Sequence, residues 1–174
     1  CIFPQSPSGS WDENSEAAKD VIAELDEVSR LYSVDADRVS LTGLSTGGYG
    51  TYAIGAKWKD RFAALVPMGS SASDYKDIAT LKGMPVRAFH NGGDPFAGVW
   101  NDTGMVDKLK SEGDDAQVTV YGAIGHDCWE TAYADGSLFK WLLQQRRQGA
   151  TASVVAPRQT SSIVPAAGAG AGGA

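Results

Sequence analysis

The sequence holds few of the residues that build metal sites and disulfide frameworks. Its 174 residues include two cysteines, Cys1 and Cys128, and two histidines, His90 and His126. These are too few and too scattered for a CxxC motif or a His/Cys zinc cluster. We therefore expect no metal site, and two cysteines that are buried or incidental rather than joined in a disulfide.

Positive charge and long apolar runs are scarce as well. Lys and Arg number 15 against 21 Asp and Glu, which gives a formal net charge of −6, and Arg146-Arg147 is the main basic cluster. A nucleic-acid-binding face needs a basic patch, so we expect no nucleic-acid partner. No apolar stretch approaches the roughly 20 residues that a transmembrane helix requires, so we expect no membrane span.

The composition that remains indicates one globular domain followed by a tail. The chain is 43% hydrophobic and 21% charged and is long enough to bury a core. Residues 148–174 are mostly Ala, Gly, Ser, Thr, Val and Pro, with Arg158 as the only charge, which is typical of a linker or a disordered segment. We therefore expect a domain at 1–147 and a linker at 148–174. Such a linker favours a secreted or periplasmic modular protein with a further domain beyond it.

Hydrophobic periodicity predicts alternating helices and strands. Residues 12–32 show helical spacing with one apolar face, and Ser10 with Glu13 suggests a capping box at the start of that helix. The predicted strands are 39–43, 63–67, 85–90 and 118–122, and the further helices are 48–58, about 100–112 and about 129–147. This alternation predicts an α/β fold with a mostly parallel sheet flanked by helices.

Three polar side chains follow predicted strands. Ser45 follows VSLTG, Asp94 follows PVRAFH, and His126 follows VTVYG. The carboxyl ends of parallel strands lie at one edge of the sheet, where ligands and catalytic groups gather. We therefore expect the three side chains to project from the same edge, although they are far apart in the sequence.

These residue types suit nucleophilic catalysis. A serine hydroxyl needs a neighbouring base to accept its proton, and a histidine that titrates near neutral pH can do so while a carboxylate orients it. The stretch Gly43-Leu44-Ser45-Thr46-Gly47 fits G-x-S-x-G, a weak signal by itself, in which a sharp strand-to-helix turn leaves no room for side chains at the two glycines. The Thr46 N–H, at the start of the following helix, would donate to an oxyanion.

Several motifs in order carry a resemblance to a known family. They are FPQSP (3–7), VDADRVSLTGLSTGGYGTY (34–52), DRFAALVPMG (60–69), FHNGGDP (89–95), GHDCW (125–129) and KWLLQQRR (140–147). Over residues 1–147 the chain resembles α/β-hydrolase carboxylesterases of the polyhydroxybutyrate-depolymerase-like and feruloyl-esterase-like group, which also includes predicted peptidases and phospholipase/carboxylesterases. Thr46 stands where such proteins commonly carry methionine, and HNGGD stands where they more often read HGDxD.

The resemblance implies roles for particular residues. It implies Ser45 as the nucleophile, Asp94 as the acid and His126 as the base, in the chain order typical of the fold. It also implies that residues 1–4 (CIFP) form about the fourth strand, so that the first strands of the sheet are missing from this chain. On that interpretation the chain is a fragment with poor activity by itself, and the second oxyanion donor would lie upstream of Cys1.

Other residues near these motifs have open interpretations. Asp102 and Asp127 are alternative acids near Asp94, and His90 either ends its strand structurally or lines the site. Trp129 would form the wall of an acyl or aryl pocket, or pack in the core. By resemblance, Gln5 and Trp11 would border the substrate cleft.

Together these features predict a serine hydrolase that cleaves a small-molecule or polymer-linked carboxylic ester through an acyl enzyme, without a cofactor. Two alternatives remain. A peptidase of the same fold would use the same residues, and a catalytically silent binding module would keep the shell of the fold without needing all three side chains.

Overall fold

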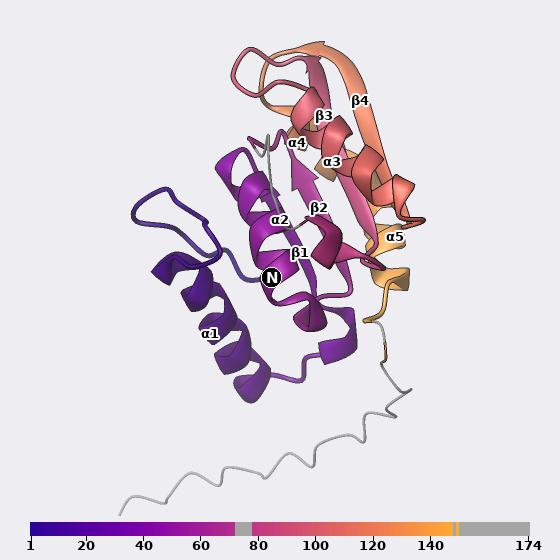
Figure 1. Cartoon of the computed structure of the whole chain (residues 1–174). Helices are drawn as coiled ribbons and strands as arrows, with labels where there is room; N and C mark the ends of the chain where they lie inside the picture. The colour runs from indigo at the N-terminus through magenta and orange to yellow at the C-terminus, as the bar shows by residue number, and fades with distance from the viewer. Residues whose placement is uncertain (72–77, 148, 150–174) are drawn as a thin grey trace, which may run out of the picture.

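A four-stranded parallel sheet forms the centre of the molecule. The computed structural model describes residues 1–71, 78–147 and 149 (Figure 1). Within them the strands lie side by side in sequence order, and each neighbouring pair is parallel. The strands are β1 (Ser40–Leu44), β2 (Ala64–Met68), β3 (Val86–Gly93) and β4 (Ala116–Ile124). The predicted parallel α/β architecture is confirmed, whereas the predicted linker at 148–174 lies outside the described residues except for Gly149.

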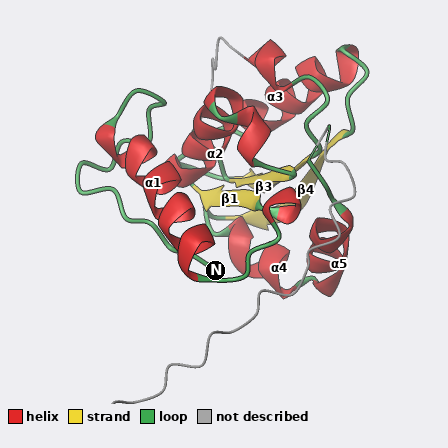
Figure 2. Ribbon diagram, turned by 90° about the horizontal axis from the view of Figure 1, so that it is seen from below, coloured by secondary structure: helices red, strands yellow, loops and turns green. Residues whose placement is uncertain are grey.

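Helices cover both faces of the sheet (Figure 2). On one side lie α1 (Glu16–Leu31), α2 (Thr46–Lys57) and α3 (Trp100–Ser111). On the other lie α4 (Cys128–Ala134) and α5 (Gly136–Gln144). Short 3-10 helices stand at η1 (Ala36–Arg38), η2 (Lys59–Arg61) and η3 (Ile78–Leu81). None of the helices in the described ranges is long and apolar enough to span a membrane.

Strand β2 contributes to a separate core on each face of the sheet. Its residues are all buried. Leu65 packs into the core shared with α1, α2 and α3, whereas Val66 and Met68 pack into the core shared with α4 and α5. A strand covered on both faces must be apolar throughout, which explains the uninterrupted run in the sequence. Burying each such side chain contributes roughly 1.5–3 kcal/mol, so the middle of the sheet is firmly held.

The N-terminal segment differs from the prediction in two places. Residues 1–4 do not form a strand, and Phe3 is 82% exposed, because no neighbouring strand in the described residues pairs with this segment. The first helix begins at Glu16 rather than near residue 12, since Ser15 is its N-cap and the Ser15 side chain accepts a hydrogen bond from the Ala18 N–H. The suggested Ser10 capping box is therefore wrong.

The predicted C-terminal helix is divided in two. Instead of one helix over 129–147, α4 ends at Ala134 and α5 begins at Gly136. Asp135 has an extended backbone, and its side chain accepts a hydrogen bond from the Ser137 N–H at 2.8 Å. An aspartate in this position is a strong N-cap, so the Asp-Gly-Ser sequence starts a new helix rather than continuing the old one.

Candidate active site

Ser45 lies on the turn between β1 and α2. Its backbone has φ +54°, and among the described residues it is the one non-glycine residue with positive φ. A hydrogen bond of 2.9 Å from the Ser45 N–H to the Met68 carbonyl ties the turn to β2, while the Ser45 carbonyl accepts the N–H of Gly48 as the helix begins. Such a conformation costs on the order of 1–3 kcal/mol and persists only where the surroundings impose it.

The turn is tight because β1 and α2 approach each other closely at Gly43. A Cβ on Gly43 would lie 2.2 Å from the Gly47 carbonyl oxygen and 2.8 Å from Thr51 Oγ1, so a side chain cannot be accommodated there. The prediction of a collision at Gly47 is wrong, since a Cβ on Gly47 would meet nothing within 4 Å. Gly47 matters for the position of its backbone carbonyl, which faces Gly43.

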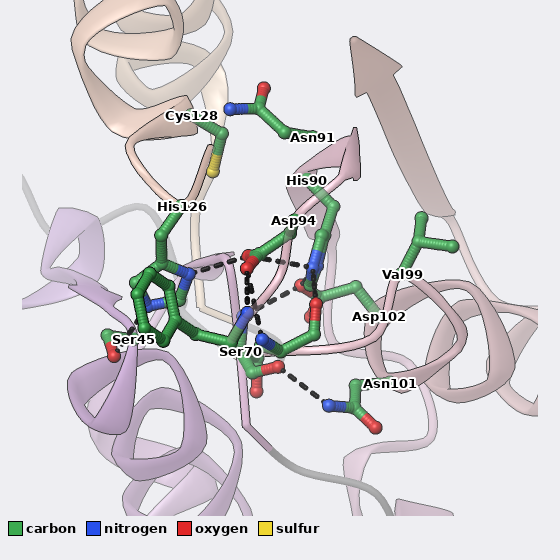
Figure 3. A network of polar contacts seen from close by, with 12 residues as sticks. Ser45, Ser70, His90, Asn91, Asp94, Val99, Asn101, Asp102, His126 and Cys128 are labelled. Carbon is green, nitrogen blue, oxygen red and sulfur yellow. Dashed lines mark hydrogen bonds and ion pairs between the residues drawn. The ribbon is translucent and has the colours of Figure 1, made fainter. Parts of the chain in front are cut away.

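His126 links the Ser45 turn to the end of β3. Its Nε2 lies 2.8 Å from Ser45 Oγ, and its Nδ1 lies 2.6 Å from Asp94 Oδ2 (Figure 3). The imidazole stands just after β4, where Gly125 turns the chain with φ +125°. The three predicted side chains therefore form one hydrogen-bonded series, with the His126 side chain 19% exposed and the Asp94 side chain fully buried.

Backbone donors hold the Asp94 carboxylate. Asp94 Oδ1 accepts hydrogen bonds from the N–H of Phe96 at 2.8 Å and of Ala97 at 3.0 Å. Burial by itself would raise the pKa of this carboxyl, but these hydrogen bonds and the one to His126 outweigh it, so the pKa of Asp94 lies below its usual value. The carboxylate is therefore ionised at neutral pH. Its Oδ1 is held by the two backbone N–H groups, and its Oδ2 faces His126.

The alternative acids are used differently. Asp102, on α3, contacts His90 rather than His126, with its Oδ2 2.7 Å from His90 Nδ1. Asp127 is exposed at the N-terminus of α4. His90 does not end its strand, because β3 continues to Gly93, and the His90 ring is completely buried behind Asp94.

Two aromatic rings flank the His126 imidazole. The Trp129 ring meets it edge-on, with centroids 5.3 Å apart and an interplanar angle of 87°. The Phe96 ring lies 5.7 Å away on centroids and is 82% exposed, whereas Trp129 is partly buried against the core of α4 and α5. Phe96 was not identified from the sequence as a residue of the site. Its position two residues after Asp94 is the feature that could have pointed to it.

The other predicted residues have local contacts. Gln5 is exposed, and its side-chain amide donates to the adjacent Pro4 carbonyl. Trp11 packs on α2, where a Cβ on Gly50 would lie 2.5 Å from the Trp11 Cβ. Neither contact involves Ser45, Asp94 or His126.

Thr46 is the first residue of α2, and the first N–H groups of a helix have no partner within it. The Thr46 N–H therefore stands beside Ser45 at the positive end of the helix.

Neither cysteine takes part in the hydrogen-bonded series of Ser45, His126 and Asp94. Both thiols are free, with Cys1 exposed and Cys128 buried. Burial and the nearby carboxylates of Asp102 and Asp94 raise the pKa of Cys128 to about 12, so this thiol stays protonated. Within the described part of the chain, no three His, Cys, Asp or Glu side chains are grouped so as to hold a metal ion.

Comparisons with known proteins concern the fold of the chain. Residues 7–72 match the prolyl oligopeptidase family, and no curated protein sequence matches the chain. A thermostable esterase superposes with a TM-score of 0.75 at 28% identity, over 81% of this chain and 42% of the esterase. The Pyrococcus horikoshii acylaminoacyl peptidase gives 0.66 at 14% identity, over 82% of this chain and 30% of the peptidase. SOBER1 of Arabidopsis thaliana gives 0.61 at 20% identity, over 82% and 70% of the two chains.

The parallel sheet flanked by helices, together with these likenesses, defines an α/β-hydrolase fold. The solved structures named above are esterases and peptidases by their descriptions, except for SOBER1. The chain spans less than half the length of the esterase and of the peptidase. The finer resemblance to polyhydroxybutyrate-depolymerase-like and feruloyl-esterase-like enzymes remains a prediction.

Proposed function

We propose that this chain carries the catalytic residues of a serine hydrolase that cleaves carboxylic esters through an acyl enzyme. The observation that carries the proposal is the series Ser45 Oγ, His126 Nε2 and Nδ1, and Asp94 Oδ2, joined at 2.8 and 2.6 Å. A hydroxyl, an imidazole and an ionised carboxylate in this order are the parts that acyl transfer from an ester requires. The strained Ser45 backbone supports the same role, because such strain gathers at functional sites.

In the first half of the reaction, Ser45 Oγ attacks the ester carbonyl carbon while its proton passes to His126 Nε2. The buried Asp94 carboxylate accepts the hydrogen bond from Nδ1 and stabilises the imidazolium. The tetrahedral intermediate then expels the alcohol, which takes the proton back from Nε2. In the second half, water attacks the acyl-serine with His126 again as base, and the carboxylic acid leaves.

The oxyanion of each tetrahedral intermediate needs hydrogen-bond donors. The Thr46 N–H at the N-terminus of α2 supplies one, assisted by the positive end of the helix. One donor is worth on the order of 3 kcal/mol of barrier lowering in serine hydrolases. We infer that the exposed Phe96 ring and the Trp129 edge form an aromatic border beside His126, which suits an acyl or alcohol group with an aromatic or bulky apolar part.

A fluorophosphonate probe tests the proposal. It forms a covalent adduct only with a serine whose hydroxyl is activated by a base. We expect the full chain to gain one adduct on Ser45, located by mass spectrometry, and Ser45→Ala and His126→Ala to gain none. Folded protein that remains unlabelled would contradict the hydrolase and favour a silent binding module with a hydrolase shell.

A peptidase is the second candidate, favoured by the match of residues 7–72 to the prolyl oligopeptidase family. Both reactions pass through the same acyl-serine, so the leaving group distinguishes them. Paired substrates with one acyl group, linked either to p-nitrophenol as an ester or to p-nitroaniline as an amide, would be compared. Turnover of the ester alone supports the esterase, and turnover of the amide at a similar kcat/KM supports the peptidase.

A further inference from the structure

A second histidine lies directly behind the triad. The His90 ring is fully buried in β3, and both of its nitrogens have hydrogen-bond partners. His90 Nδ1 lies 2.7 Å from Asp102 Oδ2. His90 Nε2 lies 2.9 Å from the Ala97 carbonyl oxygen. The same nitrogen lies 3.3 Å from Asp94 Oδ2, and Figure 3 shows His90 between Asp94 and Asp102. Every one of these partner atoms is a carboxylate or carbonyl oxygen.

The partners restrict the protons on the ring. A carbonyl oxygen can only accept, so Nε2 must carry a proton to bond Ala97. On the other side, Asp102 already accepts hydrogen bonds from the Ser70 N–H at 2.9 Å and the Tyr52 hydroxyl at 3.1 Å. An ionised carboxylate can only accept hydrogen bonds, so an ionised Asp102 bonds Nδ1 only if that nitrogen also carries a proton. An imidazole with N–H groups on both nitrogens is an imidazolium.

We propose that His90 is a buried imidazolium that acts as a positioning residue for Asp94, the carboxylate assigned to the triad under the proposed function. It contacts the Asp94 carboxylate and, through the Ala97 carbonyl, the same short loop whose N–H groups hold Asp94 Oδ1. The loop is thereby held from two sides, and Oδ2 remains directed at His126. Asp102, on α3, anchors the far side of the imidazolium.

Charge balance supports this assignment. The side chains of Asp94 and Asp102 are both fully buried, and two buried carboxylates without a cation would be very costly. Burial by itself would lower the pKa of His90, but the hydrogen bonds to Asp102 and Ala97 and the charges of Asp102 and Asp94 outweigh it, so the pKa is raised. The other titratable groups nearby are the Tyr52 hydroxyl, with a pKa raised well above its usual value, and the Cys128 thiol, with a pKa of about 12. Both stay neutral.

The imidazolium also affects the base of the triad. His90 Nε2 and His126 Nδ1 approach the same oxygen of Asp94, at 3.3 and 2.6 Å. A positive charge on His90 offsets part of the Asp94 charge at the oxygen that His126 contacts. Replacing His90 by a neutral residue should therefore leave the buried Asp94 and Asp102 carboxylates without their shared cation and loosen the position of Asp94 Oδ2.

Nitrogen NMR of the ring tests the charge directly. The chain has only two histidines, so a 15N-labelled His126→Ala variant of the full chain shows the ring of His90 alone. We expect both ring nitrogens to carry protons at pH 7. A ring with one protonated nitrogen at that pH overturns the imidazolium, because Asp102 would then hold the proton. This measurement does not depend on any enzymatic activity.

Kinetics of His90→Gln test the positioning role. Glutamine keeps an amide donor but carries no charge, so we expect kcat to fall on the order of 100-fold with little change in KM, through misplacement of Asp94. Tyr52→Phe is the matched control, since it removes a hydrogen bond from Asp102 but keeps His90, and its kcat should stay close to that of the wild type.

The outcomes separate the two proposals. An unchanged kcat in folded His90→Gln would overturn the positioning role while leaving the hydrolase intact. An unlabelled, inactive wild-type protein would overturn the hydrolase, yet the ring nitrogens would still report whether His90 is charged. If His90→Gln does not fold, the NMR measurement on the His126→Ala variant decides the charge.

Discussion

His126 Nδ1 lies 2.6 Å from Asp94 Oδ2, although the two residues are 32 positions apart in the chain. Each follows a strand of the same parallel pair, β3 and β4, and the contact spans the carboxyl ends of those strands. A second hydrogen bond joins the two strand ends, because the side-chain amide of Asn91, near the end of β3, donates to the Gly125 carbonyl at 3.0 Å. The geometry of the imidazole is therefore a property of the sheet edge rather than of one loop.

Replacing Ser45 separates activity from backbone strain. Ser45→Ala and Ser45→Gly should both reduce ester hydrolysis on the order of 1,000-fold or more, since each removes the nucleophile. Ser45→Gly should also be more stable than Ser45→Ala by about 1 kcal/mol, because glycine adopts φ +54° without the Cβ penalty. Urea unfolding of the two variants gives the difference. Equal stabilities would show that the turn is not strained.

Adding a methyl group at the two glycines of the motif should have opposite results. Gly43→Ala should destabilise the fold by about 1–3 kcal/mol or more, because its Cβ would lie 2.2 Å from the Gly47 carbonyl oxygen. Gly47→Ala is the matched control and should be neutral or stabilising by up to about 1 kcal/mol, since its Cβ meets open space within a helix. Chemical denaturation measures both, and a tolerated Gly43→Ala would contradict the tight approach of β1 and α2.

The lowered pKa of Asp94 predicts how the free energy of unfolding changes in acid. Its folded-state pKa is lowered from the ordinary aspartate value of 3.8, so ionised Asp94 contributes stability that is fully present above that value. The contribution is lost as the pH falls below 3.8 and through the lower folded-state pKa. Unfolding free energies of wild type and Asp94→Asn between pH 3 and 6 should therefore converge at the acid end. A gap that widened in acid would mean that folding raises this pKa.

Phe96 offers a test of the aromatic border. Phe96→Ala should change stability by less than about 0.5 kcal/mol, because the ring is 82% exposed. It should lower kcat/KM for aryl esters more than for acetyl esters, since the ring stands beside His126. Phe3→Ala, at a residue equally exposed, is the control and should change neither the stability nor the ratio of kcat/KM for aryl and acetyl esters. An unchanged preference in Phe96→Ala would remove Phe96 from the substrate site.

The two thiols should differ in reactivity. Cys1 is exposed, whereas Cys128 is buried with a pKa of about 12, so the native protein should react with one equivalent of a thiol-specific disulfide reagent at pH 8. The unfolded protein should react with two. Fast reaction of two thiols in the native state would show that the packing of α4 on the sheet opens readily.

Local patterns predicted most of the elements, and their failures have local causes. The strands and helices lie near their predicted positions because each shows a clear apolar period or run. Capping is harder to predict, since Ser10 and Ser15 are both residues that suit an N-cap, and the structure shows the Ser15 side chain accepting the Ala18 N–H. The break at Asp135 was overlooked because the apolar period continues across it, although a cap residue followed by glycine stands at that point.

The sequence by itself determined the parallel α/β fold and the chain positions of Ser45, Asp94 and His126. The reason is that the order and type of the residues show which polar side chains directly follow predicted strands. Only the tertiary structure decided that Asp94 rather than Asp102 meets His126, and that His90 lies buried between those two carboxylates. Asp94 and Asp102 are eight residues apart on a loop and a helix, and the direction of each side chain depends on how α3 packs against the sheet. That packing is a long-range result of the whole core, which no local pattern encodes.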